Sequence, residues 1–418
     1  MKPVDMEGVI MLDSVVFQEM SFNEFPEIIE FEQMINSFGS IPYFKINEGL
    51  PLNLMRIEGK DFINFSSYNY LGLNGNEEVM TFTKQAIDKY GTSVSASRLV
   101  SGEIDLHRAL EQKIAQFLCV EDSLVQVGGY VTNVDIVGNV VDKSDLILID
   151  SYAHRSIIEG TILSQARVKT FRHNDMAHLA LRLEKLRSKY RRVLIVVEGI
   201  YSMDGDICRL PELVDLKKRY GAILMVDEAH SLGTIGKNGR GVTSHFGIDS
   251  KDVDILMGTL SKSASSCGGY IAGSEKFINY LRYNSPSFIF SAGISPANTA
   301  AAYKSFEIFE NDSRFTKKLK DNSSYFLKGV KEIGFDTGLS EGTQIIPLIF
   351  GNSDVAREFS NRLIEAGINA LPIIYPAVKE SEARIRFFIS SLHTVEDLDY
   401  TLKVLEKLKS STMLGVEK

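Results

Sequence analysis

Cysteine is scarce in this sequence, and long apolar runs are absent. Cys119, Cys208 and Cys267 are too widely spaced for a zinc site, and three is an odd number for a disulfide framework. No apolar run approaches the ~20 residues that a membrane-spanning helix requires, and the amino terminus lacks a basic segment followed by a long apolar core. We therefore expect a cytoplasmic protein with no metal site, no disulfide bond and no integral membrane segment.

An excess of basic residues is also absent. The 418-residue chain has a formal net charge of −8 and a pI near 5.6, which argues against nucleic acid or an anionic membrane as the main partner. Hydrophobic residues make up 44% and charged residues 24% of the chain, so the composition is that of an ordinary globular protein. The length suits one large domain and a smaller one, without internal repeats.

Two short apolar runs lead into residues with reactive side chains. Residues 223–226 form a run of strand length without a polar break, which indicates a strand buried on both faces of a parallel sheet. Asp227 follows directly and His230 comes three residues later, while a second run, 253–257, leads to Lys262. Because ligand clefts of open α/β sheets lie at the carboxyl ends of strands, we expect these three side chains to meet there.

This set of side chains suits a pyridoxal phosphate (PLP) site. A lysine forms a Schiff base with the cofactor aldehyde, and a carboxylate keeps the pyridinium nitrogen protonated so that the ring can accept electrons. We expect Lys262 and Asp227 in these roles, His230 on the phenolic oxygen, and Thr259 and Ser261 on the phosphate. Taken alone, the lysine would be a surface residue and the aspartate a helix cap, but their order and spacing favour the cofactor.

The segments VDEAHSLGTIGKNGRG and MGTLSKS resemble the α-oxoamine synthase family of fold-type I PLP enzymes. The resemblance runs from about Ser66 to the carboxyl terminus and is strongest to serine palmitoyltransferases, on account of Tyr68 and Asn69. It implies an α/β fold with a large PLP-binding domain (61–300) around a mostly parallel seven-stranded sheet. A smaller C-terminal α/β domain (301–418) and an amino-terminal arm (1–60) complete the chain, and two copies form a homodimer with shared active sites.

Hydrophobic periodicity predicts where the elements of these domains lie. We expect strands near 61–65, 124–127, 145–150, 193–197, 345–350 and 384–389. We expect helices near 25–38, 77–90, 103–118, 176–190, 275–283, 301–310, 315–332 and 354–366, and a last amphipathic helix with Leu398, Leu402, Leu405 and Leu408 on one face.

The resemblance also assigns roles to residues outside the central stretch. His154, which follows a predicted strand, would stack on the cofactor ring. For the cofactor, the resemblance implies that Gly129 and Tyr130 bind the phosphate, that Ser202 lies near the ring, and that Ser291 reaches the phosphate held by the partner subunit. For the substrate, it implies that Arg386, Tyr68 and Asn69 bind the carboxylate. A guanidinium suits a carboxylate because it offers two parallel hydrogen bonds, and Arg384 on the same strand face is the rival of Arg386.

Two places depart from the family pattern. Ser93, Val94 and Ala96 stand in a loop, residues 91–98, where glycine is common in relatives, and their side chains would narrow or reshape the entrance for the acyl chain. Gly293 stands where a second hydroxyl residue is usual, which weakens the predicted contact with the partner's phosphate.

The expected reaction is a decarboxylative condensation of an amino acid, serine first, with an acyl-CoA or acyl-carrier-protein thioester. Its product is an α-amino ketone similar to 3-ketosphinganine. One alternative is an α-oxoamine synthase that uses glycine or alanine, or a carrier-protein thioester, in secondary metabolism. Another is a different PLP reaction such as transamination or C–S lysis. The last is a non-catalytic partner subunit, which Lys262 argues against because such subunits lack the Schiff-base lysine.

Overall fold

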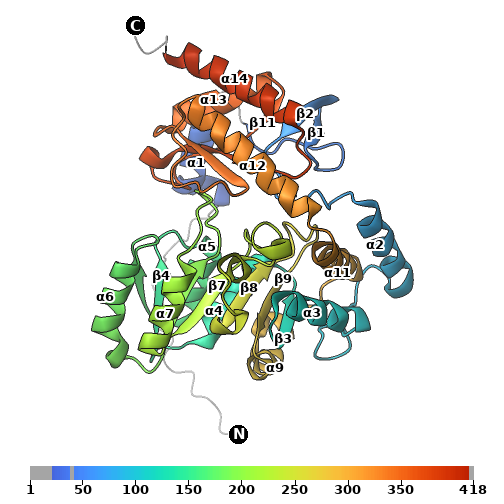
Figure 1. Ribbon diagram of the computed structural model, residues 1–418, viewed down its shortest axis with the longest axis vertical. Coiled ribbons are helices and arrows are strands. Elements are labelled where there is room, and N and C mark those ends of the chain that lie inside the picture. Colours follow the sequence, from blue (N-terminus) through green and yellow to red (C-terminus); the bar gives the residue numbers. More distant parts are fainter. Residues whose placement is uncertain (1–20, 38–41, 414–418) are drawn as a thin grey trace, which may run out of the picture. The chain divides into compact units, whose positions relative to one another are not determined.

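The computed structural model describes residues 21–37 and 42–413 (Figure 1). The chain divides into two compact units, residues 1–43 and 44–418. The described part of the first unit contains the short 3-10 helix η1 (Phe22–Glu24) and helix α1 (Pro26–Ser37). Helix α1 confirms the helix predicted at 25–38, whose last residue lies outside the described residues.

A seven-stranded sheet forms the centre of the second unit. Its strand order is β3-β9-β8-β7-β6-β4-β5. The strands are β3 (Asp122–Gln126), β4 (Leu146–Asp150), β5 (Arg167–Phe171), β6 (Val193–Glu198), β7 (Ile223–Asp227), β8 (Ile255–Thr259) and β9 (Gly269–Gly273). Strands β4 to β8 pair in parallel, whereas β9 runs antiparallel to both of its neighbours, β8 and β3. The predicted mostly parallel sheet is confirmed.

Both faces of this sheet are covered by helices, as Figure 1 shows. Alternate residues of β7 point to opposite faces, so that Leu224 and Val226 join one core cluster and Met225 joins another. Helices α3 (Asp105–Leu118), α6 (Met176–Leu186) and α7 (Leu210–Tyr220) supply the first cluster, and α4 (Gly129–Val140), α5 (Arg155–Ser164) and α9 (Glu275–Asn284) supply the second. Such double burial explains why the strands read as unbroken apolar runs.

The C-terminal part of the chain, together with residues 54–64, forms two smaller sheets with helices packed against them. One sheet has the order β10-β13-β12 and the other β1-β2-β11. Their strands are β10 (Ile345–Ile349), β12 (Pro372–Ile373), β13 (Arg384–Phe388), β1 (Leu54–Ile57), β2 (Lys60–Asn64) and β11 (Ile368–Asn369), and the helices are α12 (Arg314–Glu332), α13 (Ser353–Glu365) and α14 (Val395–Met413). The predicted smaller α/β layer at the carboxyl end is present, and β2 joins it by pairing in parallel with β11, while the domain bounds at 61–300 and 301–418 stay a prediction.

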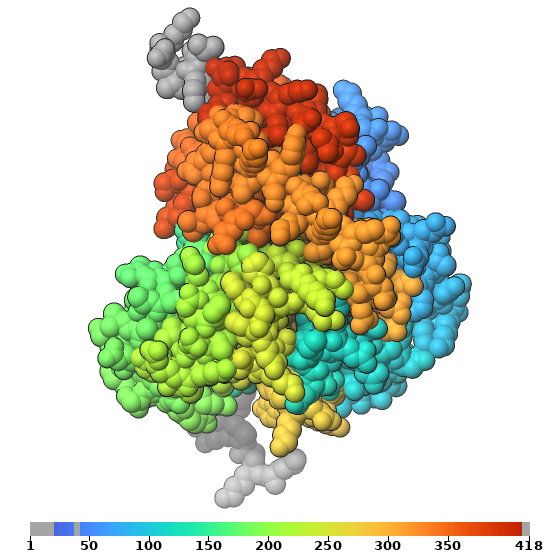
Figure 2. Space-filling model, in the orientation of Figure 1, coloured from blue at the N-terminus to red at the C-terminus, as the bar shows by residue number. Residues whose placement is uncertain are grey.

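Helices α2 (Glu77–Tyr90) and α11 (Pro296–Asn311) pack against each other, with the rings of Phe82 and Tyr303 5.8 Å apart. Ser295 caps α11 and Pro296 opens it, so this helix begins five residues before the predicted start at 301. The remaining short elements are α8 (Val242–Phe246), α10 (Pro286–Ile289), η2 (Arg187–Lys189), η3 (Lys237–Gly239), η4 (Ser250–Asp252) and η5 (Glu380–Glu382). In Figure 2 the yellow-green surface of the large domain meets the orange surface of the helices after residue 296.

Candidate active site

The carboxyl ends of β7 and β8 bring the predicted acid, imidazole and amine to one place. Asp227 is the last residue of β7, which pairs in parallel with β8. His230 lies in the turn after β7, and its Nε2 is 2.9 Å from Nζ of Lys262, three residues beyond the end of β8. The other ring nitrogen of His230, Nδ1, lies 2.9 Å from the hydroxyl of Tyr70. The lysine is thus held beside a histidine that is itself oriented by a buried tyrosine.

Burial sets the protonation of these groups. It lowers the pKa of Lys262 to about 8, although the nearby carboxylate of Asp227 favours the charged amine. Burial also lowers the pKa of His230 well below its usual value, and the positive charges of Lys262 and Arg386 lower it further. A neutral imidazole therefore faces an amine that loses its proton far more easily than a solvent-exposed lysine does.

A chain of hydrogen bonds joins Asp227 to His154. Nδ2 of Asn133 donates to Oδ2 of Asp227 at 2.7 Å and to Oγ of Ser156 at 3.0 Å. The same Ser156 hydroxyl lies 2.7 Å from Nδ1 of His154. Asn133, in the first turns of α4, was not predicted as a site residue. It fixes the orientation of the carboxylate and connects the carboxylate to the histidine predicted to stack on the ring.

The amino end of helix α4 lies against the turn that carries Lys262. A Cβ at Gly129 would lie 2.7 Å from Oγ1 of Thr259, so only glycine fits there without a shift. Thr259 donates to the carbonyl of Gly268 at 3.1 Å and accepts from the backbone N–H of Ser261 at 3.2 Å. Because the first N–H groups of a helix have no partner within the helix, this junction can bind an anion such as phosphate.

Tyr130 and Ser202 lie close to the other predicted residues. The half-exposed ring of Tyr130 meets the ring of His154 edge-on, with 6.5 Å between the ring centres. The backbone carbonyl of Ser202 accepts a hydrogen bond of 2.6 Å from Arg386. Ser291 lies in the segment after α10, and its contact with a partner subunit stays a prediction.

Arg386 and Arg384 lie on the same face of β13, but they differ in what they bind. Arg384 is buried and pairs with the carboxylate of Asp204 at 3.1 Å. Arg386 has no carboxylate partner among the described residues, and its buried Nε has no hydrogen bond there. Its guanidinium stacks over the ring of Phe388 at 4.4 Å. Arg386 is therefore the arginine that remains available for a substrate carboxylate.

Tyr68 and Asn69 are neighbours in sequence but differ in environment. The ring of Tyr68 is 43% exposed, and its centre lies 5.6 Å from Nζ of Lys262. Asn69 is buried, and its amide binds the backbone of Asn74 in its own loop and the backbone carbonyl of Pro51, which precedes β1. Tyr68 borders the site, whereas Asn69 holds the loop that presents it.

Glu198 is a buried carboxyl that was not assigned a role from the sequence. It ends β6 and pairs in register with Asp227 on β7. Burial raises the pKa of Glu198 well above its usual value, and the charge of Asp227 raises it further. Its Oε1 has no partner among the described residues. The shift favours the protonated, uncharged form of Glu198 beside Asp227.

His173, in the turn between β5 and α6, is bound on both sides by carboxylates. Its Nδ1 lies 2.9 Å from Asp150 and its Nε2 lies 2.8 Å from Asp206. Burial alone would lower the pKa of His173, but the two aspartates raise it to about 9. The charged ring stacks on Tyr152, two residues before His154, with 4.2 Å between ring centres. His173 thereby supports the loop that carries His154.

Residues 21–37 and 42–413 contain no group of three or more histidine, cysteine or acidic side chains arranged to hold a metal ion. Nor does this described part of the chain contain a helix long and apolar enough to cross a membrane.

Residues 60–405 match the family described as aminotransferase class I and II. An 8-amino-7-oxononanoate synthase from Thermoanaerobacter pseudethanolicus is 42% identical over 352 residues, covering 84% of this chain and 89% of that protein. The chain belongs to this aminotransferase family, as an α-oxoamine synthase. A serine palmitoyltransferase variant from S. paucimobilis, solved with a PLP–myriocin adduct, is 28% identical with a TM-score of 0.89 over 94% of this chain and 100% of that chain.

A second solved structure, an 8-amino-7-oxononanoate synthase from Francisella tularensis, is 26% identical with a TM-score of 0.72. It covers 84% of this chain and 99% of that chain. The predicted family, fold and cofactor are thus confirmed, and the chain is an acyltransferase of this family. The preference for serine is not supported by the sequence relatives, whose names favour the alternative reading with another amino acid.

PLP is the cofactor of this family, and the residues present fit it. The amine of Lys262 is buried with a lowered pKa, as a carbonyl-binding lysine requires. The glycine at position 129 leaves the helix terminus open beside Thr259. The unpartnered Nε of Arg386 offers a donor for a carboxylate.

Proposed function

We propose that the protein condenses alanine with a pimeloyl thioester, as the name 8-amino-7-oxononanoate synthase implies for its relatives. One observation carries this proposal: relatives of that name from several bacteria are 38–42% identical over 84–87% of the chain. Serine palmitoyltransferases are similar at 28–29% identity. We further propose a cytoplasmic homodimer in which Ser291 of each subunit contacts the phosphate bound by the other.

The structure of the product identifies the two substrates. 8-Amino-7-oxononanoate carries a methyl group and an amine on the carbon next to a ketone, followed by five methylene groups and a carboxylate. Loss of carbon dioxide from alanine leaves the CH₃–CH–NH₂ unit, and a seven-carbon dicarboxylic thioester supplies the remainder. The new carbon–carbon bond replaces the carbon–sulfur bond of the thioester, and the leaving thiolate takes up a proton equivalent to the α-proton. The carbon that loses carbon dioxide takes one proton from solvent, so atoms and charges balance.

The residues at the strand ends would hold the cofactor. Lys262 would bind its aldehyde carbon, Asp227 its ring nitrogen, His230 its phenolic oxygen, and His154 one face of the ring, close to Ser202. The phosphate would lie at Gly129, Tyr130, Thr259 and Ser261. When bound, PLP supplies an electron sink for the pair of electrons left on the amino acid α-carbon.

The protein's own groups would then bind the amino acid and move its protons. Arg386, with Tyr68 beside it, would bind the carboxylate and fix the direction of the bond that breaks when carbon dioxide leaves. Lys262, whose pKa is lowered to about 8, is the proposed acceptor of the α-proton, 2.9 Å from His230. Asn69 would act only by shaping the loop that presents Tyr68, because its amide is already bound.

Serine with a long-chain acyl thioester is the second candidate. The observation that favours it is the higher TM-score to serine palmitoyltransferase, 0.89 against 0.72, over a larger share of the chain. Both candidates share the same cofactor site and differ in the amino acid and the acyl chain. Substrate tests separate them.

The test offers purified holoenzyme three amino acids (alanine, serine and glycine) with pimeloyl-CoA, pimeloyl-carrier protein and palmitoyl-CoA. Free thiol, carbon dioxide and the mass of the ketone are measured in parallel. We expect turnover with alanine and a pimeloyl thioester, and none in Lys262→Ala. Turnover with serine and palmitoyl-CoA alone would replace the first candidate by the second, and transamination without thiol release would contradict both.

A further inference from the structure

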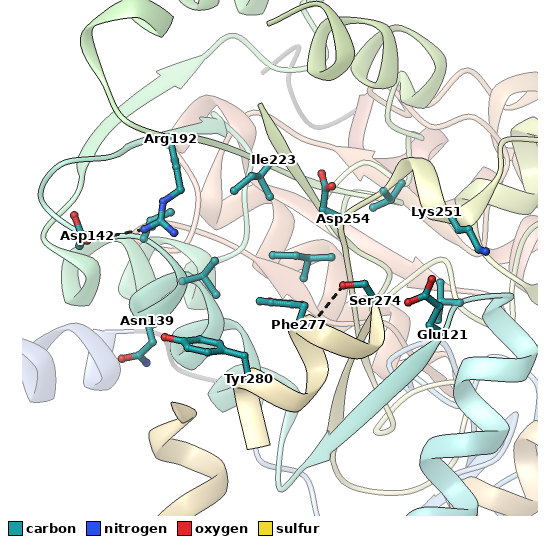
Figure 3. A pocket seen from close by; sticks show the side chains of 16 residues that line it. Glu121, Asn139, Asp142, Arg192, Ile223, Lys251, Asp254, Ser274, Phe277 and Tyr280 are labelled. Carbon is teal, nitrogen blue, oxygen red and sulfur yellow. Dashed lines mark hydrogen bonds and ion pairs between the residues drawn. The ribbon is translucent and has the colours of Figure 1, made fainter. Parts of the chain in front are cut away.

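The two ends of β7 differ in what the polar side chains near them bind. The amino end borders a cavity of about 720 Å³, whose residues Arg192 and Asp254 form ion pairs with neighbouring side chains at 2.7 and 2.9 Å (Figure 3). The carboxyl end leads into the turn that carries His230, and there a buried amide from a distant part of the chain binds the backbone. This amide belongs to Gln344, which the sequence did not mark as a site residue.

Gln344 connects the smaller sheet β10-β13-β12 to the turn that carries His230. The residue lies directly before β10 and is 1% exposed. Its backbone carbonyl accepts a hydrogen bond of 2.8 Å from the N–H of Ile389, just beyond β13. Its side chain extends to the turn after β7, where Nε2 donates to the backbone carbonyl of His230 at 2.7 Å. One of the two amide hydrogens is therefore used on the backbone of His230.

The second amide hydrogen binds the hydroxyl of Tyr70. Burial raises the pKa of Tyr70 well above its usual value, whereas a side-chain hydrogen bond with Gln344 lowers it. Only a donor to the phenol oxygen has this effect, because it stabilises the charged form. Oε1 of Gln344 has no partner among the described residues, so the hydrogen bond comes from Nε2. The oxygen of Tyr70 is thus an acceptor for Gln344.

The hydrogen of the Tyr70 hydroxyl then determines which nitrogen of His230 carries a proton. Tyr70 is fully buried, and its oxygen lies 2.9 Å from Nδ1 of His230; the described residues offer this hydrogen no other acceptor. A buried O–H without an acceptor costs free energy, so Tyr70 donates to Nδ1. Burial lowers the pKa of His230 well below its usual value and so favours the neutral ring, which has a single N–H. That N–H is on Nε2.

Nε2 is the ring nitrogen that faces the cofactor edge, 2.9 Å from Nζ of Lys262. We propose that Gln344 is a positioning residue, which acts through Tyr70 to keep the N–H of His230 on Nε2, as the donor to the phenolic oxygen of PLP. This role rests on the proposed place of that oxygen beside His230. A donor there favours the ionised form of the phenol over the protonated form.

Three variants of the holoenzyme test this chain of contacts. Gln344→Met keeps an unbranched side chain of similar length and removes both N–H donors. Tyr70→Phe removes the hydroxyl and leaves the hydrogen bond between Gln344 and the carbonyl of His230 in place. Gln126→Met is the matched control, because Gln126 is also buried and its Nε2 donates to two side chains, neither of which is Tyr70 or His230.

Two measurements report the proposed role. Nitrogen-15 NMR of labelled histidine shows which ring nitrogen of His230 is protonated, with His230→Gln to assign its signals. The absorbance of bound PLP shows the shares of ionised and protonated phenol. In Gln344→Met and in Tyr70→Phe we expect the ratio of the Nε2–H to the Nδ1–H form to fall about two- to tenfold, and the ratio of protonated to ionised phenol to rise by a similar factor. Gln126→Met should change neither ratio.

The double variant Gln344→Met/Tyr70→Phe separates a route through the Tyr70 hydroxyl from one through the backbone of His230. We expect it to match Tyr70→Phe, because Gln344 has no further effect on the ring once the hydroxyl is gone. A further loss of the same size would place the effect on the backbone and overturn the proposal. A wild-type His230 with its N–H on Nδ1, or unchanged ratios in Gln344→Met, would overturn it as well.

These measurements need neither the amino acid nor the thioester, so they do not depend on which substrates the enzyme uses. Treatment of the wild-type holoenzyme with borohydride tests the cofactor site separately, by attaching PLP to Lys262. Failure to label Lys262 would overturn the proposed cofactor site and with it the contact to the phenolic oxygen. A labelled Lys262 together with the wrong form of His230 would overturn only the role of Gln344.

Discussion

Replacement of Gly129 by alanine tests whether the helix terminus and the lysine turn form one unit. The added Cβ would lie 2.7 Å from Oγ1 and 2.9 Å from Cβ of Thr259, well inside ordinary contact distance. Thr259 cannot turn away freely, because its hydroxyl bonds Gly268 and Ser261 on either side of Lys262. The alanine must therefore displace α4, the lysine turn, or both.

The expected cost follows from these contacts. Overpacking of a filled site costs about 1–3 kcal/mol, and loss of the threonine hydrogen bonds adds about 0.5–1.5 kcal/mol each. The better helix propensity of alanine offsets about 1 kcal/mol at most. We expect Gly129→Ala to lower the free energy of unfolding by about 1–5 kcal/mol. Since 1.4 kcal/mol is about a factor of ten, PLP affinity should fall about tenfold or more if the same strain opposes binding.

Gly128→Ala is the matched control. A Cβ at Gly128 meets no atom within 4 Å, and its φ of −169° is extended backbone that alanine adopts readily. Melting temperature without cofactor and PLP titration by absorbance should separate the two variants. If Gly129→Ala has the same melting temperature and PLP affinity as Gly128→Ala, the amino end of α4 and the lysine turn do not form the proposed single unit.

Three further predictions concern the network around the cofactor. Asn133→Ala removes the donor to Asp227, so PLP affinity should fall about tenfold or more, measured by absorbance titration. Arg386→Lys keeps the charge but loses the two-pronged donor, so the KM for the amino acid should rise about tenfold or more while PLP affinity stays the same. The raised pKa of His173, about 9, gives stability that is complete below pH ~6.5 and is lost as pH rises through about 9. Wild type should therefore lose up to about 3 kcal/mol more stability than His173→Asn between pH 6 and 10, whereas equal losses would contradict this.

The central sheet was predictable because its strands are buried on both faces. The run 223–226 predicted β7, and Asp227, which we propose binds the cofactor ring, lies at its end as expected. Helix α2 has the predicted bounds because Asn76 caps it and Gly91 ends it. Where a segment has a clear apolar pattern and capping residues at its ends, the sequence predicts both the element and its bounds.

The antiparallel strand β9 was missed for a physical reason. Its sequence GYIAG has glycine at both ends, which is weak evidence for a strand. In the structure a Cβ at Gly269 would lie 2.3 Å from Thr132 and one at Gly273 would lie 2.8 Å from the backbone of Asp254. The glycines are there because neighbouring elements approach the strand closely, and such contacts between distant segments leave no local pattern.

Asn133, Tyr70 and Glu198 were missed in a similar way. Each lies in a segment that was interpreted correctly, but its partner is far away in sequence: Asp227 for Asn133, His230 for Tyr70, and the neighbouring strand for Glu198. Hydrophobic periodicity predicts on which face of a helix or strand a residue lies. It does not predict which distant polar group forms a hydrogen bond with that residue. Residue type at a strand end or helix start was the only available signal, and it does not separate a site residue from a cap.

The two departures from the family pattern turn out to be one structural change. A Cβ at Gly293 would lie 3.0 Å from Cγ2 of Val94 and 2.9 Å from Cγ of Arg98, so the valine occupies the space that a side chain at position 293 would need. The loop and the segment after α10 are joined there, since Gly293 N–H donates to the carbonyl of Ala96 at 3.0 Å. Compared with the family pattern, the loop 91–98 has fewer glycines than usual and the segment after α10 has an additional one, Gly293. The two places are some 200 positions apart in sequence. In the fold they are the two sides of one contact, so a change at either position has to be read together with the other.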